Sequence, residues 1–223
     1  MSYYPILVDL EGRKVVVIGG GRVAQRKIES FLEYGADVHV ASKELTPRLR
    51  RLVDKGEIGF IGPEFHDESL QGAFLVIAAT DDPLLNHRIS QVAKGKNILV
   101  NAVDQPSDCT FIVPSILRRG DLVISASTSG KSPALAKKIR ETLAGQFGEE
   151  YGAFLVMMGR LRKEILQRGL SQKENSRVFR ELLHSPILNG IHDKNYGEVS
   201  SILSRILERT VSADDVIRYL KAE

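Results

Sequence analysis

The residues with the clearest chemical meaning form a glycine-rich stretch, Gly19-Gly20-Gly21-Arg22-Val23-Ala24. The stretch fits the pattern G-x-G-x-x-G/A, in which the first glycine permits a tight turn and the second lets the backbone approach a pyrophosphate. Ala24 is small enough for the following helix to pack closely on a sheet. Phosphates would lie at the helix N-terminus, where free N–H groups favour anions. The pattern predicts a dinucleotide site, and a purely structural glycine turn is the alternative.

The acidic residue that usually binds the adenosine ribose is missing. It is expected about 20 residues after the glycines, at the tip of the second strand, but the sequence there is Val40-Ala41-Ser42-Lys43-Glu44. Ser42, Lys43 or Glu44 could contact the ribose from the loop, and Lys43 could instead favour a 2′-phosphate. The sequence therefore leaves the choice between NAD and NADP open.

Two further loops are expected at the same edge as the glycine turn. Ala79 and Thr80 follow a buried strand, and small residues there permit close approach to a cofactor, whereas Asp82 is expected to cap the next helix. Asp104 follows the next strand along, in the loop Asn101-Ala102-Val103-Asp104-Gln105-Pro106. Its carboxylate would lie near the nicotinamide and could take a proton from a substrate that loses hydride. An ordinary loop aspartate is the alternative.

A fourth candidate is the hydroxyl- and glycine-rich turn 125–133, Ser-Ala-Ser-Thr-Ser-Gly-Lys-Ser-Pro. Ser132 as helix cap and Pro133 at the first helical position explain part of the turn without any function. The basic residues Lys131, Lys137, Lys138 and Arg140 make an anion site equally plausible.

These loops need a scaffold of alternating strands and helices, and hydrophobic periodicity predicts one. Strands are expected at 14–18, 37–41, 58–61, 74–79 and 98–100, and helices at 23–34, 47–55 and 83–93. Gly35 is placed to end the first helix and Thr46-Pro47 to begin the second. Alternation of this kind predicts a Rossmann-like α/β fold with a doubly wound parallel sheet and right-handed crossovers.

After Asn101 the pattern changes. One strand is expected at 122–127 and one helix at 133–143, and only helical periodicity follows from Tyr151. We expect a dinucleotide-binding domain at 1–113, a small α+β segment at 114–148 and an all-helical C-terminal domain at 149–223.

Composition excludes several classes of protein. With 43% hydrophobic and 26% charged residues, the 223-residue chain is typical of a globular protein. A net charge of +3 is too small for a nucleic-acid-binding protein but suits an anionic substrate. No apolar run is long enough for a membrane span, and residues 1–6 do not resemble a signal peptide. A cytoplasmic location is expected.

The five histidines (His39, His66, His87, His184 and His192) are scattered, and no His/Cys cluster has metal-ligand spacing. No preformed metal site is therefore expected. Cys109 is the single cysteine, which excludes an intrachain disulfide; we expect a buried small side chain rather than a nucleophile.

Taken together, the motifs resemble those of the siroheme synthase N-terminal module, a family that includes stand-alone precorrin-2 dehydrogenase/sirohydrochlorin ferrochelatase. The similar stretches occur in family order across residues 3–145 and are far more specific than the glycine pattern alone. They comprise Tyr4-Pro5-Ile6, Val17 to Lys27, Ala78 to Asp82, Asn101 to Asp104, Phe111 to Ser115 and Ser129 to Ala136. Arg26-Lys27 after the glycines and the Ser132-Pro133 helix start are not general Rossmann features.

The resemblance implies oxidation of precorrin-2 to sirohydrochlorin with NAD as the hydride acceptor, by a homodimer that associates through the segment after residue 113. It implies that Asp104 is catalytic, as general base or as an orienting carboxylate. The expected cofactor contacts are Gly19, Gly20, Gly21, Arg22, Val23, Ala24, Ser42, Lys43, Glu44, Ala79 and Thr80. The expected contacts to the substrate and its carboxylates are Arg118, Arg119, Thr128, Ser129, Gly130, Lys131 and Ser132.

Three departures from the family pattern matter. The 223 residues leave no room for the methyltransferase domain that some members carry. Thr128 stands where a serine is often found, which puts a hydroxyl role there in doubt. Some stand-alone members are dehydrogenases only, so insertion of Fe²⁺ stays open. Two other functions are alternatives. A non-enzymatic nucleotide sensor would usually keep the ribose acid, and the intact glycine pattern argues against a chelatase without redox activity.

Overall fold

The computed structural model describes residues 3–221, so Met1, Ser2, Ala222 and Glu223 lie outside the described part. The chain forms two compact units, with the boundary between Val113 and Pro114. The predicted division into three domains, with boundaries at residues 113 and 148, stays a prediction.

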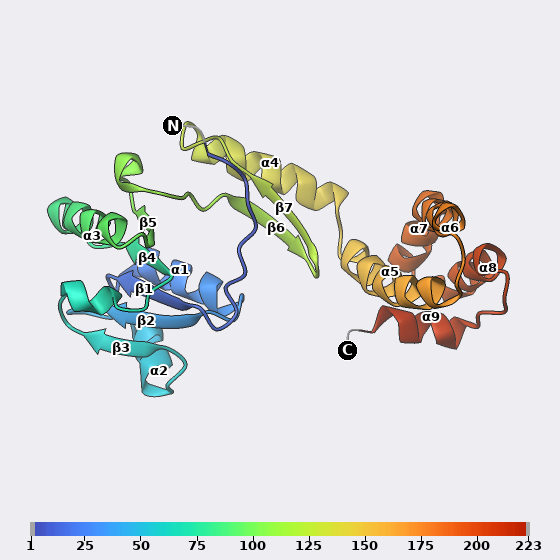
Figure 1. Cartoon of the computed structure of the whole chain (residues 1–223), viewed down its shortest axis with the longest axis horizontal. Coiled ribbons are helices and arrows are strands. Elements are labelled where there is room, and N and C mark those ends of the chain that lie inside the picture. Colours follow the sequence, from blue (N-terminus) through green and yellow to red (C-terminus); the bar gives the residue numbers. More distant parts are fainter. Residues whose placement is uncertain (1–2, 222–223) are drawn as a thin grey trace. The chain divides into compact units, whose positions relative to one another are not determined.

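The first unit is built on a five-stranded parallel sheet, drawn in blue to green in Figure 1. The strand order β3-β2-β1-β4-β5 is that of a doubly wound sheet, so the predicted fold class is confirmed. The strands are β1 (Lys14–Ile18), β2 (Asp37–Ala41), β3 (Gly59–Gly62), β4 (Leu75–Ala78) and β5 (Leu99–Ala102). The helices are α1 (Arg22–Leu32), α2 (Pro47–Asp54) and α3 (Pro83–Gly95), with short 3₁₀ turns η1 (Asp67–Leu70) and η2 (Pro106–Asp108).

Both faces of this sheet are buried, which explains the unbroken apolar run of β1. Val15 and Val17 pack beneath α1 and α2 on one face. Val16 and Ile18 pack with the residues of α3 on the other. Because successive strand side chains point to opposite faces, a strand covered on both sides needs apolar residues at every position. The expected elements of this unit are present, and no end differs from its expected position by more than two residues.

The second unit begins with an antiparallel hairpin of β6 (Ser115–Arg119) and β7 (Leu122–Ala126), against which α4 (Pro133–Gln146) packs. Arg119 pairs with Leu122, so Gly120 and Asp121 form a two-residue turn, and Gly120 has φ +57°. The sequence analysis predicted β7 but missed β6. A Gly-Asp pair between apolar runs is a hairpin signal that could have revealed it.

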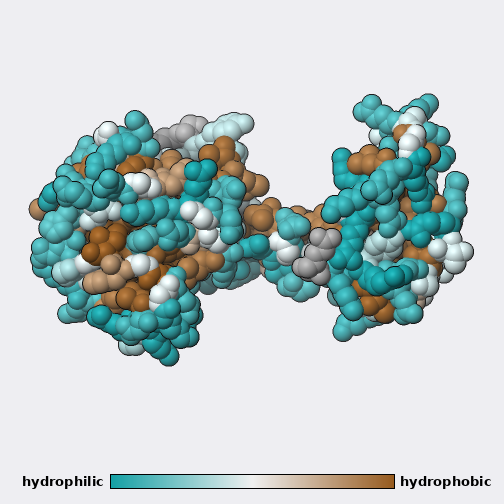
Figure 2. All heavy atoms as spheres, turned by 60° about the horizontal axis from the view of Figure 1, so that its bottom comes forward, coloured by the Kyte–Doolittle hydropathy of each residue, from teal (hydrophilic) through white to brown (hydrophobic). Residues whose placement is uncertain are grey.

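Five helices complete the described part of the second unit: α5 (Glu150–Gln167), α6 (Gln172–His184), α7 (Ile187–His192), α8 (Tyr196–Leu207) and α9 (Ala213–Leu220). Their apolar faces share one core, which includes Met157, Leu161 and Leu203. Polar residues cover most of the surface of these helices that Figure 2 turns to the viewer. The predicted helical C-terminal region is confirmed. Between residues 3 and 221, no helix has the length and apolar character that crossing a bilayer demands.

Candidate functional site

The strand register aligns the candidate loops at one edge of the sheet. Ile18 pairs with Ala41 and with Ala78, and Ala78 pairs with Ala102. The residues that follow these four strands therefore emerge side by side. In a sheet of this order, ligands bind at the carboxyl ends of the strands, where the strand order reverses between β1 and β4.

Two of the three glycines in the turn are required by the packing of the protein itself. Gly19 has φ +120°, and a Cβ there would lie 2.2 Å from the carbonyl oxygen of Ala79. A Cβ at Gly20 would lie 1.9 Å from the carbonyl oxygen of Glu44. The loops after β2 and β4 thus press directly against the turn after β1. The sequence analysis explained Gly19 but not the packing requirement at Gly20.

Gly21 differs, because a Cβ built there would meet no protein atom within 4 Å. Gly21 is the N-cap of α1, and it has no side chain to accept from the N–H groups of the first turn. Those N–H groups, from Arg22 and its successors, precede the first helical hydrogen bond, from Gln25 N to Gly21 O (2.9 Å). Ala24 is fully buried against the sheet. Open space beside free donors fits the pyrophosphate of a dinucleotide.

The loop after β2 lies beside the glycine turn, as expected for a ribose-binding segment. Thr46 N donates to Gly20 O (3.0 Å), and Ser42 Oγ donates to Glu44 O (2.7 Å). The Lys43 ammonium pairs with Glu64 at 3.2 Å, and both side chains are largely exposed. An exposed pair of this kind is weak and can exchange partners.

The loop after β4 is held by a buried asparagine on α3. Thr80 Oγ1 donates to Asn86 Oδ1 (2.8 Å), and Asn86 Nδ2 donates to Thr80 O (3.0 Å). Asp82 accepts from Leu84 N (2.9 Å) and Leu85 N (3.2 Å), so the predicted capping role is confirmed. Ala79 and Thr80 therefore offer a fixed backbone surface next to Gly19.

Asp104 lies in a turn directly after β5 and is exposed. Gln105 N donates to Ala102 O (3.3 Å), which closes the turn, and Asp104 has φ +59°. This left-handed conformation favours glycine at the third position of a turn. Glycine adopts this conformation without cost, and aspartate tolerates it better than most other residues. The turn lies two strands from Gly19, or about 10 Å.

Lys27 is a neighbour of this loop that the resemblance includes but to which the sequence analysis gave no role. It lies on α1 one turn after Ala24 and is half-buried. It makes no hydrogen bond or ion pair within residues 3–221. Burial and the like charge of Arg26 lower its pKa, and the ammonium lies within electrostatic reach of Cys109. Helix side chains point toward the N-terminus, so Lys27 extends toward the ligand edge.

Cys109 is buried, as predicted, and supports the Asp104 turn from within. Ala102 N donates to its sulfur (3.3 Å), and the thiol faces the carbonyl oxygens of Ala102 (3.3 Å) and Gln105 (3.4 Å). Burial raises the pKa of the thiol, which keeps it protonated and able to donate.

In the second unit, the turn before α4 is organised by its own hydroxyls. Thr128 Oγ1 accepts from Ser132 N (3.0 Å), and Ser132 Oγ caps α4 by accepting from Leu135 N (3.3 Å). Ser129 and Gly130 have φ +52° and +82°. The structural roles of Ser132 and Pro133 are confirmed, and Thr128 gains one. Binding of an anion by Ser129, Gly130 and the exposed Lys131 stays a prediction.

The two arginines of β6 differ in their surroundings. The Arg119 guanidinium is partly buried and donates to Phe147 O (3.1 Å), while lying 3.3 Å from Glu149. It therefore joins the hairpin to the segment between α4 and α5. Arg118 is exposed, and its Nε donates to Gly120 O (3.2 Å). Their contact with a substrate stays a prediction. Within the described residues, no three His, Cys, Asp or Glu side chains are grouped to hold a metal ion.

Comparisons with known proteins agree with this geometry. A family model described as NAD(P)-binding matches residues 6–115, and the model of the central part of the sirohaem biosynthesis protein matches residues 119–146. A solved structure of SirC, precorrin-2 dehydrogenase, is 27% identical with a TM-score of 0.72, covering 92% of this chain and 100% of that one.

Curated relatives are named siroheme synthase. The protein from Photorhabdus laumondii is 41% identical over 174 residues, covering 78% of this chain and 37% of the relative. The protein from Mannheimia succiniciproducens is 36% identical over 184 residues, covering 82% and 39%. This chain spans about two fifths of the length of these relatives. From the matched family models, the relatives and the shared fold, the chain belongs to the siroheme synthase N-terminal module family.

Proposed function

We propose that the chain catalyses the NAD-dependent oxidation of precorrin-2 to sirohydrochlorin. The observation that carries the proposal is the arrangement at the carboxyl edge of the sheet. The open space at Gly21, where a phosphate would bind, follows β1, and the exposed Asp104 carboxylate follows β5. These two strands lie two places apart in one sheet. The names of SirC and of the siroheme synthases give the substrate class.

NAD, when bound, supplies a hydride acceptor, and the residues of the chain supply its position. The N–H groups at the start of α1 would hold the pyrophosphate, and the Ser42–Glu44 loop would contact the adenosine ribose. Ala79 and Thr80 form the surface beside the glycine turn. The macrocycle loses a hydride and a proton, and the Asp104 carboxylate accepts that proton.

The nucleotide-sensor alternative is weaker, because a sensor needs no carboxylate at Asp104.

We further propose that the chain works as a homodimer in the cytoplasm, with NAD supplied there. Leu135 and Ile139 on α4 are 49% and 39% exposed, which supports association through the segment 114–148. Basic residues of the second unit, among them Arg118 and Lys131, would meet the substrate carboxylates. Sedimentation of the purified chain tests the dimer.

The purified protein is expected to convert precorrin-2 to sirohydrochlorin when NAD is added, with a change in the visible spectrum. Because the Glu64 carboxylate beside Lys43 would repel a 2′-phosphate, turnover with NAD is expected to exceed turnover with NADP. The two cofactors are compared side by side under anaerobic conditions. No turnover with either would refute the proposal. Adding Fe²⁺ to preformed sirohydrochlorin in the same assay decides whether the chain also inserts iron.

Replacing Lys27 with methionine is expected to stabilise the free protein by about 1 kcal/mol at neutral pH, because a half-buried, unpaired ammonium is removed. The KM for the anionic substrate is expected to rise about tenfold, since the lost charge faces the ligand edge. Urea unfolding and steady-state kinetics measure the two effects.

The difference in the free energy of unfolding between the wild type and Lys27→Met should also change with pH, in a direction that the pKa of Lys27 fixes. The folded-state pKa is lowered, so below the unfolded value of 10.5 the unfolded chain binds more protons. The stability of the wild type should therefore rise relative to Lys27→Met as the pH increases from about 7 to about 10. A difference that does not change with pH would contradict a lowered pKa at Lys27.

A further inference from the structure

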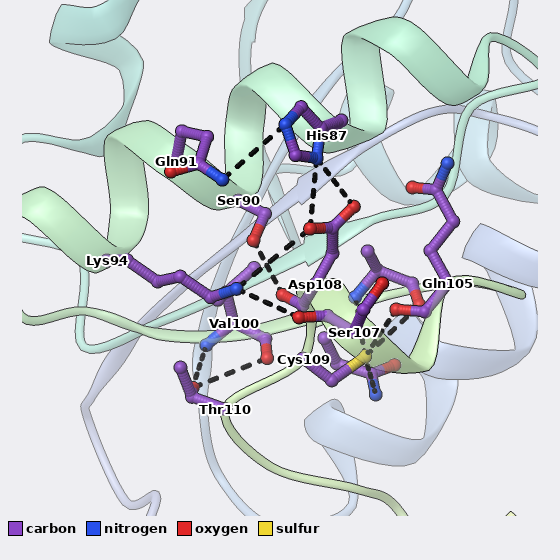
Figure 3. A network of polar contacts seen from close by, with 12 residues as sticks. His87, Ser90, Gln91, Lys94, Val100, Gln105, Ser107, Asp108, Cys109 and Thr110 are labelled. Carbon is purple, nitrogen blue, oxygen red and sulfur yellow. Dashed lines mark hydrogen bonds and ion pairs between the residues drawn. The ribbon is translucent and has the colours of Figure 1, made fainter.

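The chain that follows Asp104 lies along one face of α3. Figure 3 shows this segment, residues 105–110, which we call the strap, beneath the helix. Its partners on α3 are spaced by three or four residues, so they form one helical stripe. Gln105 Nε2 donates to Pro83 O (2.9 Å), Asp108 contacts His87, Ser90 Oγ donates to Asp108 O (2.6 Å), and Lys94 Nζ donates to Ser107 O (3.2 Å).

The centre of the strap is a buried carboxylate. The Asp108 side chain is only 9% exposed, and its two oxygens lie 2.9 and 3.0 Å from His87 Nδ1. The Lys94 ammonium lies 4.0 Å away. A buried carboxylate is costly unless charged or donating groups surround it, so Asp108 fixes where the strap can lie. His87 is the residue that the sequence analysis set aside as one of several scattered histidines.

The far end of the strap is fixed as well. Thr110 N donates to Val100 O (2.8 Å), and Val100 N donates to Thr110 Oγ1 (2.9 Å). Cys109, which follows Asp108 directly, reaches back to both ends of the Asp104 turn through its sulfur. The contacts of Asp108 and Cys109 therefore hold the segment that directly follows the Asp104 turn.

A single backbone hydrogen bond closes the Asp104 turn, so the contacts of the strap that follows it also hold the position of the turn. We propose that Asp108, clamped by His87 and Lys94, is a positioning residue that holds the Asp104 carboxylate where the substrate loses its proton. This inference rests on the proposed function, in which Asp104 touches the substrate. Asp108 acts through the strap, because its carboxylate is 9% exposed and lies against His87 and Lys94.

The test is a double-mutant cycle between Asp108→Asn and Asp104→Ala. Alone, Asp108→Asn keeps the shape of the side chain but loses its charge, and it should lower kcat by up to about 100-fold because the carboxylate at Asp104 loses its position. NAD affinity should change less than about twofold. In the Asp104→Ala background, Asp108→Asn should have no further effect on the residual rate. Equal loss of rate in both backgrounds, or none in either, would overturn the proposal.

The matched control is the ion pair of Arg88 with Asp67, which ties the same helix to a neighbouring segment. Its atoms are 3.0 Å apart, and the side chains are 61% and 47% exposed. Asp67→Asn should leave kcat unchanged. If Asp108→Asn does not fold, His87→Gln replaces it, since Gln retains a donor for the Asp108 carboxylate while removing the imidazole. The same cycle with Asp104→Ala is then measured.

A second measurement needs no substrate and so separates this inference from the proposed function. Hydrogen–deuterium exchange of the peptide covering residues 101–105 should accelerate in Asp108→Asn and remain unchanged in Asp67→Asn. If exchange is faster in Asp108→Asn but the wild type shows no turnover, the proposed function is refuted while the role of Asp108 in holding residues 101–105 is supported. If exchange at residues 101–105 is unchanged in Asp108→Asn, Asp108 does not hold the Asp104 turn, whatever turnover is measured.

Discussion

Replacing Asp104 with glycine is expected to raise the free energy of unfolding and to abolish most of the oxidation of precorrin-2. Asp104 has φ +59°, a conformation that costs an ordinary residue about 1 kcal/mol and costs glycine almost nothing. Its side chain is exposed, so no packing is lost. Loss of the carboxylate should lower kcat by about 10² to 10⁴-fold. Thermal unfolding and the precorrin-2 assay measure the two effects.

Two other variants separate the backbone from the carboxylate. Asp104→Ala should fold and dimerise, lose most turnover and gain no stability, because alanine has no advantage at a positive φ. Asp104→Asn keeps the shape of the side chain and should also lose turnover, since an amide does not accept the proton. A variant without the carboxylate that retained a near-normal rate would show that Asp104 is not the base. A glycine variant less stable than wild type would show that the turn carries no strain.

The scaffold of the site could be predicted because its signals are local. The β-branched run 14–18, the glycines after it and the capping pairs Thr46-Pro47 and Asp82-Pro83 each specify structure within a few residues of chain. Parallel strands then bring their carboxyl ends together whatever the details of packing. The positions of Gly21 and Asp104 at one edge follow from that rule alone.

The parts that could not be predicted depend on contacts between distant segments. Gly20 must be glycine because the carbonyl group of Glu44 approaches it, 24 residues further along the chain. Asp108 and His87 are 21 residues apart, and neither fits a motif. The conformation of Asp104 also has no sequence signature, since aspartate is common in ordinary loops. Periodicity could not show these contacts because it describes one element at a time.

Replacing Gly21 with valine is expected to leave the fold intact and to weaken NAD binding by about 100-fold, or about 2.7 kcal/mol. The backbone at Gly21 (φ −78°, ψ −173°) is open to any residue, and a Cβ there meets no protein atom within 4 Å. The added methyl groups would occupy the space from which a phosphate approaches the start of α1. Stability should fall by no more than about 1 kcal/mol. Titration with NADH, followed by its fluorescence, measures the affinity.

Gly19→Ala is the matched comparison, because it adds a Cβ in the same turn but on the protein side. That Cβ would lie 2.2 Å from Ala79 O on a backbone with φ +120°, so the variant should lose about 3 kcal/mol of stability or fail to fold. Gly21→Val therefore tests whether the ligand needs open space, and Gly19→Ala tests whether the packing of the protein itself needs a glycine. If Gly21→Val bound NADH as tightly as wild type, the open space at Gly21 would not be the phosphate cradle. The dinucleotide would then have to lie elsewhere on the sheet edge.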